Sequence, residues 1–165
     1  MIIRQHKKYK KPKRLFDKAR IDEENKLVKI YGLKNKKEIW KADYFIGNLR
    51  KQAKKLITAP AEKQDEFIAR LARRNIVKKG SQIDDVLALA KEAILERRLQ
   101  TIVFRKQLAK TPKEARQLIT HRHVKIKGRI VTIPSYSVDS DEEKEISVQK
   151  KEKKIKEIAE EIENA

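Results

Sequence analysis

Cationic side chains are the residues best suited to chemistry in this sequence, and they concentrate between residues 97 and 138. This stretch holds eleven Lys and Arg against a single acid, Glu114, and carries +10 of the chain's net +19. Its apolar residues recur at helical and strand spacings, which indicates a folded frame. Cations on a folded frame predict binding to a phosphate backbone. The residues predicted to make these contacts are Arg97, Arg98, Arg105, Lys106, Lys110, Lys113, Arg116, Arg122, Lys125, Lys127 and Arg129, with His121 and His123 as additional donors at a helix-to-strand junction.

The sequence contains few residues in the patterns that catalysis or metal binding requires. The chain has no Cys, which excludes disulfides, thiol nucleophiles and thiolate zinc sites. His121 and His123 have the H-x-H spacing of a metal site on a strand, but no third ligand lies near them in the sequence. Asp84 and Asp85 are ordinary residues for a helix start. No glycine-rich phosphate loop or nucleophile elbow is present. We therefore predict that the protein is not an enzyme and uses no metal or cofactor.

Two helices and a hairpin are predicted to carry the cations. The apolar residues Leu95, Leu99 and Ile102 are spaced four and three residues apart. This spacing predicts a helix from residue 98 to about 108. A second helix begins after Thr111, which can act as N-cap with Pro112 at the first helical position and Glu114 completing a capping box. Its apolar side consists of Ala115, Leu118 and Ile119.

The pattern then changes from helical to alternating. A tight turn at Lys127-Gly128 would place Ile126 opposite Arg129 and Val124 opposite Val131, with Gly128 supplying the positive φ that such a turn needs. Pro134 ends the second strand. The face expected to meet the core carries Val124, Ile126, Val131 and Ile133.

These residues resemble a known family. The segment ERRLQTIVFR, followed by TPKEARQLITHRHVKIKGRIVTIPSY, closely resembles the RNA-binding domain named after small-subunit ribosomal protein S-four. The upstream segment YGLKNKKEIWKA resembles the archaeal and eukaryotic branch of that ribosomal family. The resemblance spans roughly residues 8–138. It departs from the family at Gln100, where an acid is usual, and at Lys127, where Asn is frequent.

The resemblance implies a function. Proteins of this family bind small-subunit (16S-type) ribosomal RNA at a multi-helix junction, nucleate assembly of the subunit body and contact ribosomal protein five of the small subunit. They lie near the place where messenger RNA enters, and they bear on decoding accuracy. The expected location is therefore the small ribosomal subunit in the cytoplasm. Two rivals are a stand-alone RNA-binding regulator, such as a messenger repressor or heat-shock-type protein, and an RNA-modifying enzyme.

A basic extension is predicted at the N-terminus, over residues 1–14. Residues 1–20 contain nine Lys and Arg against one acid, Asp17, and show no apolar period before Leu15. Such a run is either disordered in the free protein or threads between RNA strands, with Tyr9 and Phe16 available for stacking. The cations predicted to contact RNA are Lys8, Lys10, Lys11, Lys13 and Arg14.

A helical body of three to four helices is predicted over residues 15–96. The first helix runs from Leu15 to Tyr31 and is closed by Gly32. The next begins after Asn35, with Glu38 at its third position, and buries a long apolar stripe, while Trp40 is expected to pack rather than to stack on a ligand. A third helix covers residues 61–76. A fourth, capped by Ser81 or Asp84, carries Val86 to Leu95 toward the basic stretch.

The charge reverses after residue 138. Residues 139–165 contain ten acids and six Lys, and isoleucines at helical spacing from Ile155 to Ile162 predict a partly helical charged tail. The tail is either solvated or contacts a basic neighbouring protein.

The complete prediction is a mainly α protein with a small α/β RNA-binding domain over residues 97–138. It has two lobes, a helical body and a helix-turn-helix-hairpin module. No stretch approaches eighteen apolar residues, so we expect no membrane partner.

Overall fold

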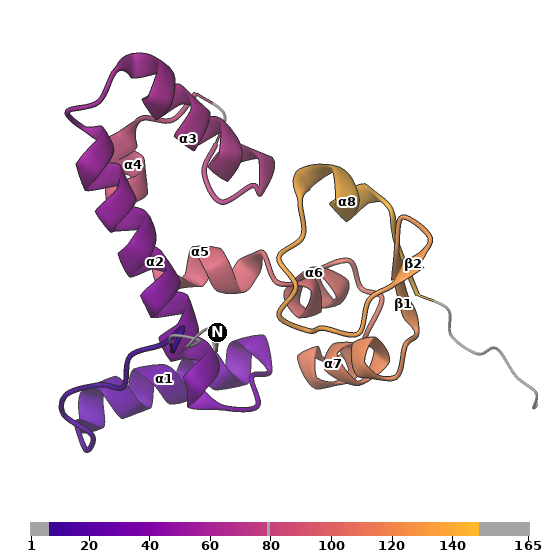
Figure 1. Cartoon of the computed structure of the whole chain (residues 1–165). Coiled ribbons are helices and arrows are strands. Elements are labelled where there is room, and N and C mark those ends of the chain that lie inside the picture. Colours follow the sequence, from indigo (N-terminus) through magenta and orange to yellow (C-terminus); the bar gives the residue numbers. More distant parts are fainter. Residues whose placement is uncertain (1–6, 79, 149–165) are drawn as a thin grey trace, which may run out of the picture.

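The computed structural model describes residues 7–78 and 80–148, which form eight helices and three short strands (Figure 1). The helices are α1 (Lys18–Tyr31), α2 (Lys36–Leu56), α3 (Ala61–Arg73), α4 (Ile83–Ala88), α5 (Lys91–Glu96), α6 (Leu99–Arg105), α7 (Pro112–Thr120) and α8 (Ser140–Lys144). The strands are β1 (Val124–Ile126), β2 (Arg129–Ile130) and β3 (Ile146–Val148). The predicted fold class, mainly α with a small α/β module, is confirmed. Below, residues 15–96 are called the helical body and residues 97–148 the module.

Helix α2 is the spine of the helical body. Helix α1 crosses its N-terminal end, α3 and α4 pack at its C-terminal end, and α5 leads away from it into the module (Figure 1). The predicted stripe is confirmed, because Ile39, Ala42, Ile46, Leu49 and Ala53 are all buried. The body has two separate apolar cores. One joins α2 to α3 and α4, and the other joins α1, the start of α2 and Leu95.

The fourth helix of the body differs from the prediction. The chain forms two short helices, α4 and α5, separated by Leu89 and Ala90 in extended conformation. The break lets Val86 enter the core with α3 while Leu95 enters the core with α1. Arg50 Nη2 donates to the carbonyl of Leu89, which lies in this break, at 2.6 Å. The cap of α4 is Gln82, paired with Asp85, rather than Ser81 or Asp84.

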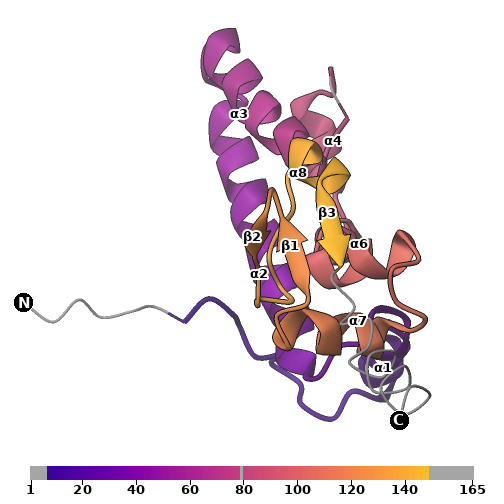
Figure 2. The same cartoon turned by 90° about the vertical axis from the view of Figure 1, so that its right-hand side faces the viewer.

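The module packs α6 and α7 against one face of a three-stranded antiparallel sheet (Figure 2). Thr111 Oγ1 accepts from the backbone N–H of Glu114 at 3.1 Å, so the predicted N-cap of α7 is confirmed. Lys127 and Gly128 both have positive φ, at 50° and 75°, and Ile126 pairs with Arg129 as predicted. The left-handed pair is the geometry of a type I′ hairpin turn.

The predicted core face of the hairpin is wrong at Ile133, whose side chain is 57% exposed. The second strand is only two residues long, and the pairing with β1 ends at Val131, whose N–H donates to the carbonyl of Val124 at 3.1 Å. The chain then runs past the start of α6, where the N–H groups of Leu99 and Gln100 donate to the carbonyls of Tyr136 and Pro134. Further along the same segment, Val138 is buried in the module core.

The acidic segment after residue 138 is also not simply a tail. Residues 139–148 form α8 and β3, and β3 pairs with β1 so that the strand order is β2-β1-β3 (Figure 2). Ile146 is buried in the module core beside Ile126. The helix expected around Ile155 to Ile162 lies outside the described residues.

Candidate nucleic-acid interface

The described part of the basic N-terminal extension lies along the helical body. The Tyr9 ring stacks on Trp40 of α2 with centroids 6.5 Å apart, and Lys37 Nζ lies 4.8 Å from the Tyr9 centroid. Arg20 of α1 donates to the carbonyls of Arg14 and Leu15 at 3.1 and 3.0 Å. Residues 7–14 are called the arm. All five of its predicted contact residues are exposed, and these are Lys8, Lys10, Lys11, Lys13 and Arg14.

The two aromatic residues predicted to stack on RNA have different environments. The Tyr9 ring already stacks on Trp40. The Nε1 of Trp40 in turn donates to the buried carboxylate of Glu24 at 3.1 Å. Trp40 therefore packs within the protein, as predicted. Phe16 is 93% exposed and remains open to a partner.

The module presents a second group of exposed cationic and imidazole side chains. Two of them lie at sharp backbone corners, because Arg122 follows α7 with φ 65° and Lys127 forms the hairpin turn with φ 50°. Arg105 is also exposed but pairs with Glu96 at 2.7 Å, and the side chains of His123 and Lys125 are half-buried. Among the residues predicted to contact RNA, those that are exposed and have no ion pair in the described chain are Lys110, Lys113, His121, Arg122, Lys127 and Arg129.

Two other predicted contact residues bind inside the protein. Arg97 pairs with Glu143 of α8 at 2.8 Å and donates to the carbonyls of Arg74 and Val138 at 3.1 and 3.2 Å. Lys106 donates to the backbone carbonyl of Glu143. These groups hold α8 against α6 and the end of α3, so a phosphate contact at either would compete with an existing bond.

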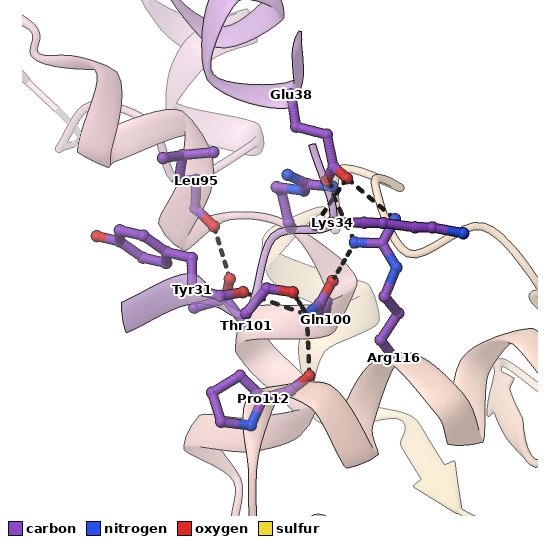
Figure 3. Close-up of polar contacts among 10 residues, drawn as sticks. Tyr31, Lys34, Glu38, Leu95, Gln100, Thr101, Pro112 and Arg116 are labelled. Carbon is purple, nitrogen blue, oxygen red and sulfur yellow. Dashed lines mark hydrogen bonds and ion pairs between the residues drawn. The ribbon is translucent and has the colours of Figure 1, made fainter. Parts of the chain in front are cut away.

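Arg98 and Arg116 converge on one carboxylate of the helical body, that of Glu38. Figure 3 shows Glu38 and Arg116 directed toward each other. Arg116 Nη2 lies 3.0 Å from Oε1, Arg98 pairs with Oε2, and the backbone N–H of Lys34 donates to Oε1 at 3.3 Å. Arg98 is only 7% exposed. Burial alone would raise the pKa of Glu38, but hydrogen bonds from Arg116 and Arg98 outweigh it and lower that pKa.

Gln100 adds a second bridge beside this carboxylate (Figure 3). Its Nε2 donates to the carbonyls of Tyr31, Gly32 and Pro112 at 3.2, 3.0 and 2.9 Å, and its Oε1 accepts from Arg116 at 3.4 Å. We call Glu38, Arg98, Gln100 and Arg116 the junction. It joins the start of α2 and the α1–α2 turn to α6 and α7.

Sequence reasoning missed the junction. Glu38 was expected to complete a cap at Asn35, yet the Asn35 side chain makes no capping bond and the carboxylate points to the module. The partners are 60 and 78 residues away in the chain, so no local pattern connects them. Gln100 departs from the acid usual in the family, and that departure was the one signal of a special position.

The described groups supply positive charge and hydrogen-bond donors rather than a reaction centre. No cluster of three or more His, Cys, Asp or Glu that could hold a metal occurs in residues 7–78 and 80–148. None of the helices in this part of the chain combines the length and hydropathy that crossing a membrane requires.

Comparison with known proteins covers most of the chain. Residues 4–96 match the family model described as the ribosomal protein S4/S9 N-terminal domain, and residues 97–144 match that of the S4 domain. The chain is 48% identical over 151 residues to small ribosomal subunit protein uS4 of Methanoregula boonei, covering 86% of this chain and 82% of that protein. It is 48% identical to the protein of the same name from Thermoplasma acidophilum (86% and 75% covered) and 43% identical to that from Korarchaeum cryptofilum (87% and 89% covered).

Proposed function

Because this chain belongs to the family of small ribosomal subunit protein uS4, we propose that it is a structural constituent of the small ribosomal subunit and binds the subunit's ribosomal RNA directly. The role is structural rather than catalytic. The observation that supports RNA contact best is the presence of exposed cations in two parts of the described chain, the arm and the module, in a chain with net charge +19.

The form of RNA suited to this surface follows from charge and shape. Duplex RNA buries its base edges in a deep, narrow groove, so proteins bind it through phosphates, 2′-hydroxyls and overall shape. Arginine can bridge phosphates with its planar fork, which favours places where strands meet. Arg122 and Arg129 are exposed arginines at corners of the module. We therefore propose that the target is a junction of RNA helices rather than a single uninterrupted helix.

The finer role follows from the family resemblance. We propose that the chain nucleates assembly of the subunit body and contributes to translational accuracy. We further propose contact with ribosomal protein five of the small subunit and with messenger RNA where it enters. The exposed acid of α8, Asp141, is unsuited to RNA and would face a protein neighbour.

The test is a charge reversal at exposed module cations. Lys113→Glu with Arg122→Glu should weaken binding of the full chain to small-subunit ribosomal RNA by roughly tenfold or more, because two phosphate contacts become repulsive. Lys144→Glu is the matched control, since Lys144 is exposed among the acids of α8. Arg116 is unsuitable because it pairs with Glu38. Equal affinities of the double variant and the control would show that Lys113 and Arg122 do not contact RNA.

A stand-alone RNA-binding regulator is the alternative function. A ribosomal constituent should migrate with small subunits in a sucrose gradient at a salt concentration that removes loosely bound proteins. A regulator should remain in the light fractions with its messenger. The segment from Tyr31 to Ala42, which contains Glu38 and matches the ribosomal branch, favours the ribosomal role.

A further inference from the structure

We propose that Glu38 is a positioning residue for RNA binding, which fixes the module relative to the helical body so that the arm and the module reach one RNA together. This inference rests on the proposed function, since it concerns how the same RNA is bound. Glu38 itself is an acid and would repel phosphate. Its contribution would therefore come entirely through the arginines that it holds.

The contacts place Glu38 at the meeting point of the two lobes. Its carboxylate has a side-chain exposure of 15% and binds Arg98 of the α6 cap and Arg116 of α7, which are 8% and 25% exposed. Both arginines belong to the module, whereas Glu38 belongs to α2. The carboxylate is thus the shared counter-ion of two cations that would otherwise repel each other at close range.

The contacts around Glu38 that join the two lobes are directional hydrogen bonds and ion pairs rather than a shared apolar core. The module core and the cores of the helical body are separate clusters. Between them lie the bonds of Gln100 to the carbonyls of Tyr31 and Gly32, and the close approach of Gly32 to Pro112. Hydrogen bonds specify orientation more narrowly than apolar contact does. Loss of Glu38 would leave Arg98 buried without its carboxylate, and the lobes would separate to hydrate it.

The arm belongs to the helical-body side of the junction, whereas the exposed cations of the module belong to its other side. The arm is attached to α1 and α2 through Tyr9 and Arg20, so it moves with the helical body. When two linked sites bind one target, the second contact forms at an effective concentration set by the linkage geometry. A fixed junction raises that concentration, and a loose one lowers it.

Charge counting alone makes the opposite prediction. Glu38→Gln removes one negative charge, which would tighten binding to a polyanion if only net charge mattered. A positioning role requires weaker binding. The sign of the change therefore separates the two explanations.

The experiment measures the affinity of the full chain for small-subunit ribosomal RNA in three proteins: the wild type, Glu38→Gln and Glu145→Gln. Glu145 is exposed and makes no side-chain bond within the described chain, so it is the matched control for charge. We expect Glu38→Gln to bind roughly tenfold or more weakly and Glu145→Gln to bind as well as the wild type or slightly better. Glu38→Gln binding as tightly as Glu145→Gln would overturn the proposal. A wild type that fails to bind this RNA would instead overturn the proposed function.

A second measurement tests orientation directly. The natural chain has no Cys, so Thr58→Cys and Thr132→Cys place one spin label on each lobe at exposed, uncharged positions. The label-to-label distance distribution should broaden in Glu38→Gln without RNA, while helical circular dichroism is retained. An unbroadened distribution would overturn the positioning role even if affinity fell. Should Glu38→Gln unfold, Glu38→Asp keeps the charge but shortens the reach. That variant should broaden the distribution, and no broadening in it would also contradict the proposal.

Discussion

Arginine has two different roles in this protein, and its surroundings decide which. Arg122 is exposed at a left-handed corner after α7 and makes no ion pair within the described chain, so its guanidinium is available to a ligand. Arg98 is buried against Glu38, and its Nε has no partner among the described residues. A desolvated guanidinium needs its counter-ion, because removal of that partner is costly. The same charge therefore serves binding at one position and architecture at the other.

Gly32 is the residue at which a single methyl group should disturb the contact between the lobes. Its φ is +59°, and a Cβ there would lie 2.7 Å from Pro112 Cβ and 3.1 Å from Gln100 Nε2. The left-handed conformation alone costs about 1–2 kcal/mol for a residue with a Cβ. Gly32→Ala should lower the free energy of unfolding in urea by at least that amount.

Gly47 provides the matched control for this substitution. It lies within α2, and nothing comes within 4 Å of a Cβ built on it. Gly47→Ala should raise the free energy of unfolding by about 0.5–1 kcal/mol, since alanine favours the helix. A Gly32→Ala protein as stable as Gly47→Ala would contradict the close packing of the α1–α2 turn against α7.

The junction should also impose a pH dependence on stability. The pKa of Glu38 in the folded protein lies below its ordinary value of 4.5. The stabilisation by its ionised form is therefore fully present above pH 4.5 and is lost as the pH falls through the lower folded value. Urea denaturation of the wild type and Glu38→Gln should show the largest stability difference near neutral pH and a shrinking one in acid. A difference that stayed constant down to strongly acidic pH would show that Glu38 does not act through its charge.

At the scale of elements, signals confined to a few neighbouring residues predicted the structure well. The Thr111 cap and the Lys127-Gly128 turn are both present where the sequence indicated them. Elements that depend on distant partners were not predicted. Strand β3 has only three residues and one buried side chain, Ile146, and it forms because β1 lies open beside it. The break between α4 and α5 likewise lets Val86 of α4 enter one core of the body and Leu95 of α5 enter the other.

Strand β3 should contribute measurably to the stability of the module. Ile146 is buried in the module core, so Ile146→Ala should lower the free energy of unfolding by about 2 kcal/mol or more. Ile133, which the alternating pattern placed in the core, is 57% exposed, so Ile133→Ala should change stability by no more than about 0.5 kcal/mol. Urea denaturation of both proteins checks the pair. If Ile133→Ala were instead more destabilising than Ile146→Ala, the predicted core face of the hairpin would be correct. Residues 139–148 would then be a tail that contributes little to the module.

At the scale of the whole molecule, the cations predicted to contact RNA lie in two places, the arm and the module, and a buried ionic contact joins the module to the helical body. Composition alone indicated a polyanionic partner, and it could do so because net charge does not depend on the fold. It could not indicate which cations remain open, because Arg97, Arg98, Lys106 and Arg116 bind groups that are distant in the chain. Of the cations predicted to contact RNA, those that the fold leaves exposed and unpaired are in the arm and in the module.

Salt dependence of RNA binding can count the contacts in each place. Each phosphate contact contributes a slope of roughly 0.7–0.9 to the fall of log affinity with log salt. One variant neutralises the arm with Lys8→Gln, Lys10→Gln and Lys11→Gln, and a second neutralises the module with Lys110→Gln, Lys113→Gln and Arg122→Gln. If both lobes hold the same RNA, each variant should lower the slope by about 2–3, and the combined variant should lower it by the sum. A variant with an unchanged slope would show that its lobe does not touch phosphate. If the arm variant had an unchanged slope, only the module would contact phosphate among the residues tested. The orientation of the module relative to the helical body would then have no role in RNA binding.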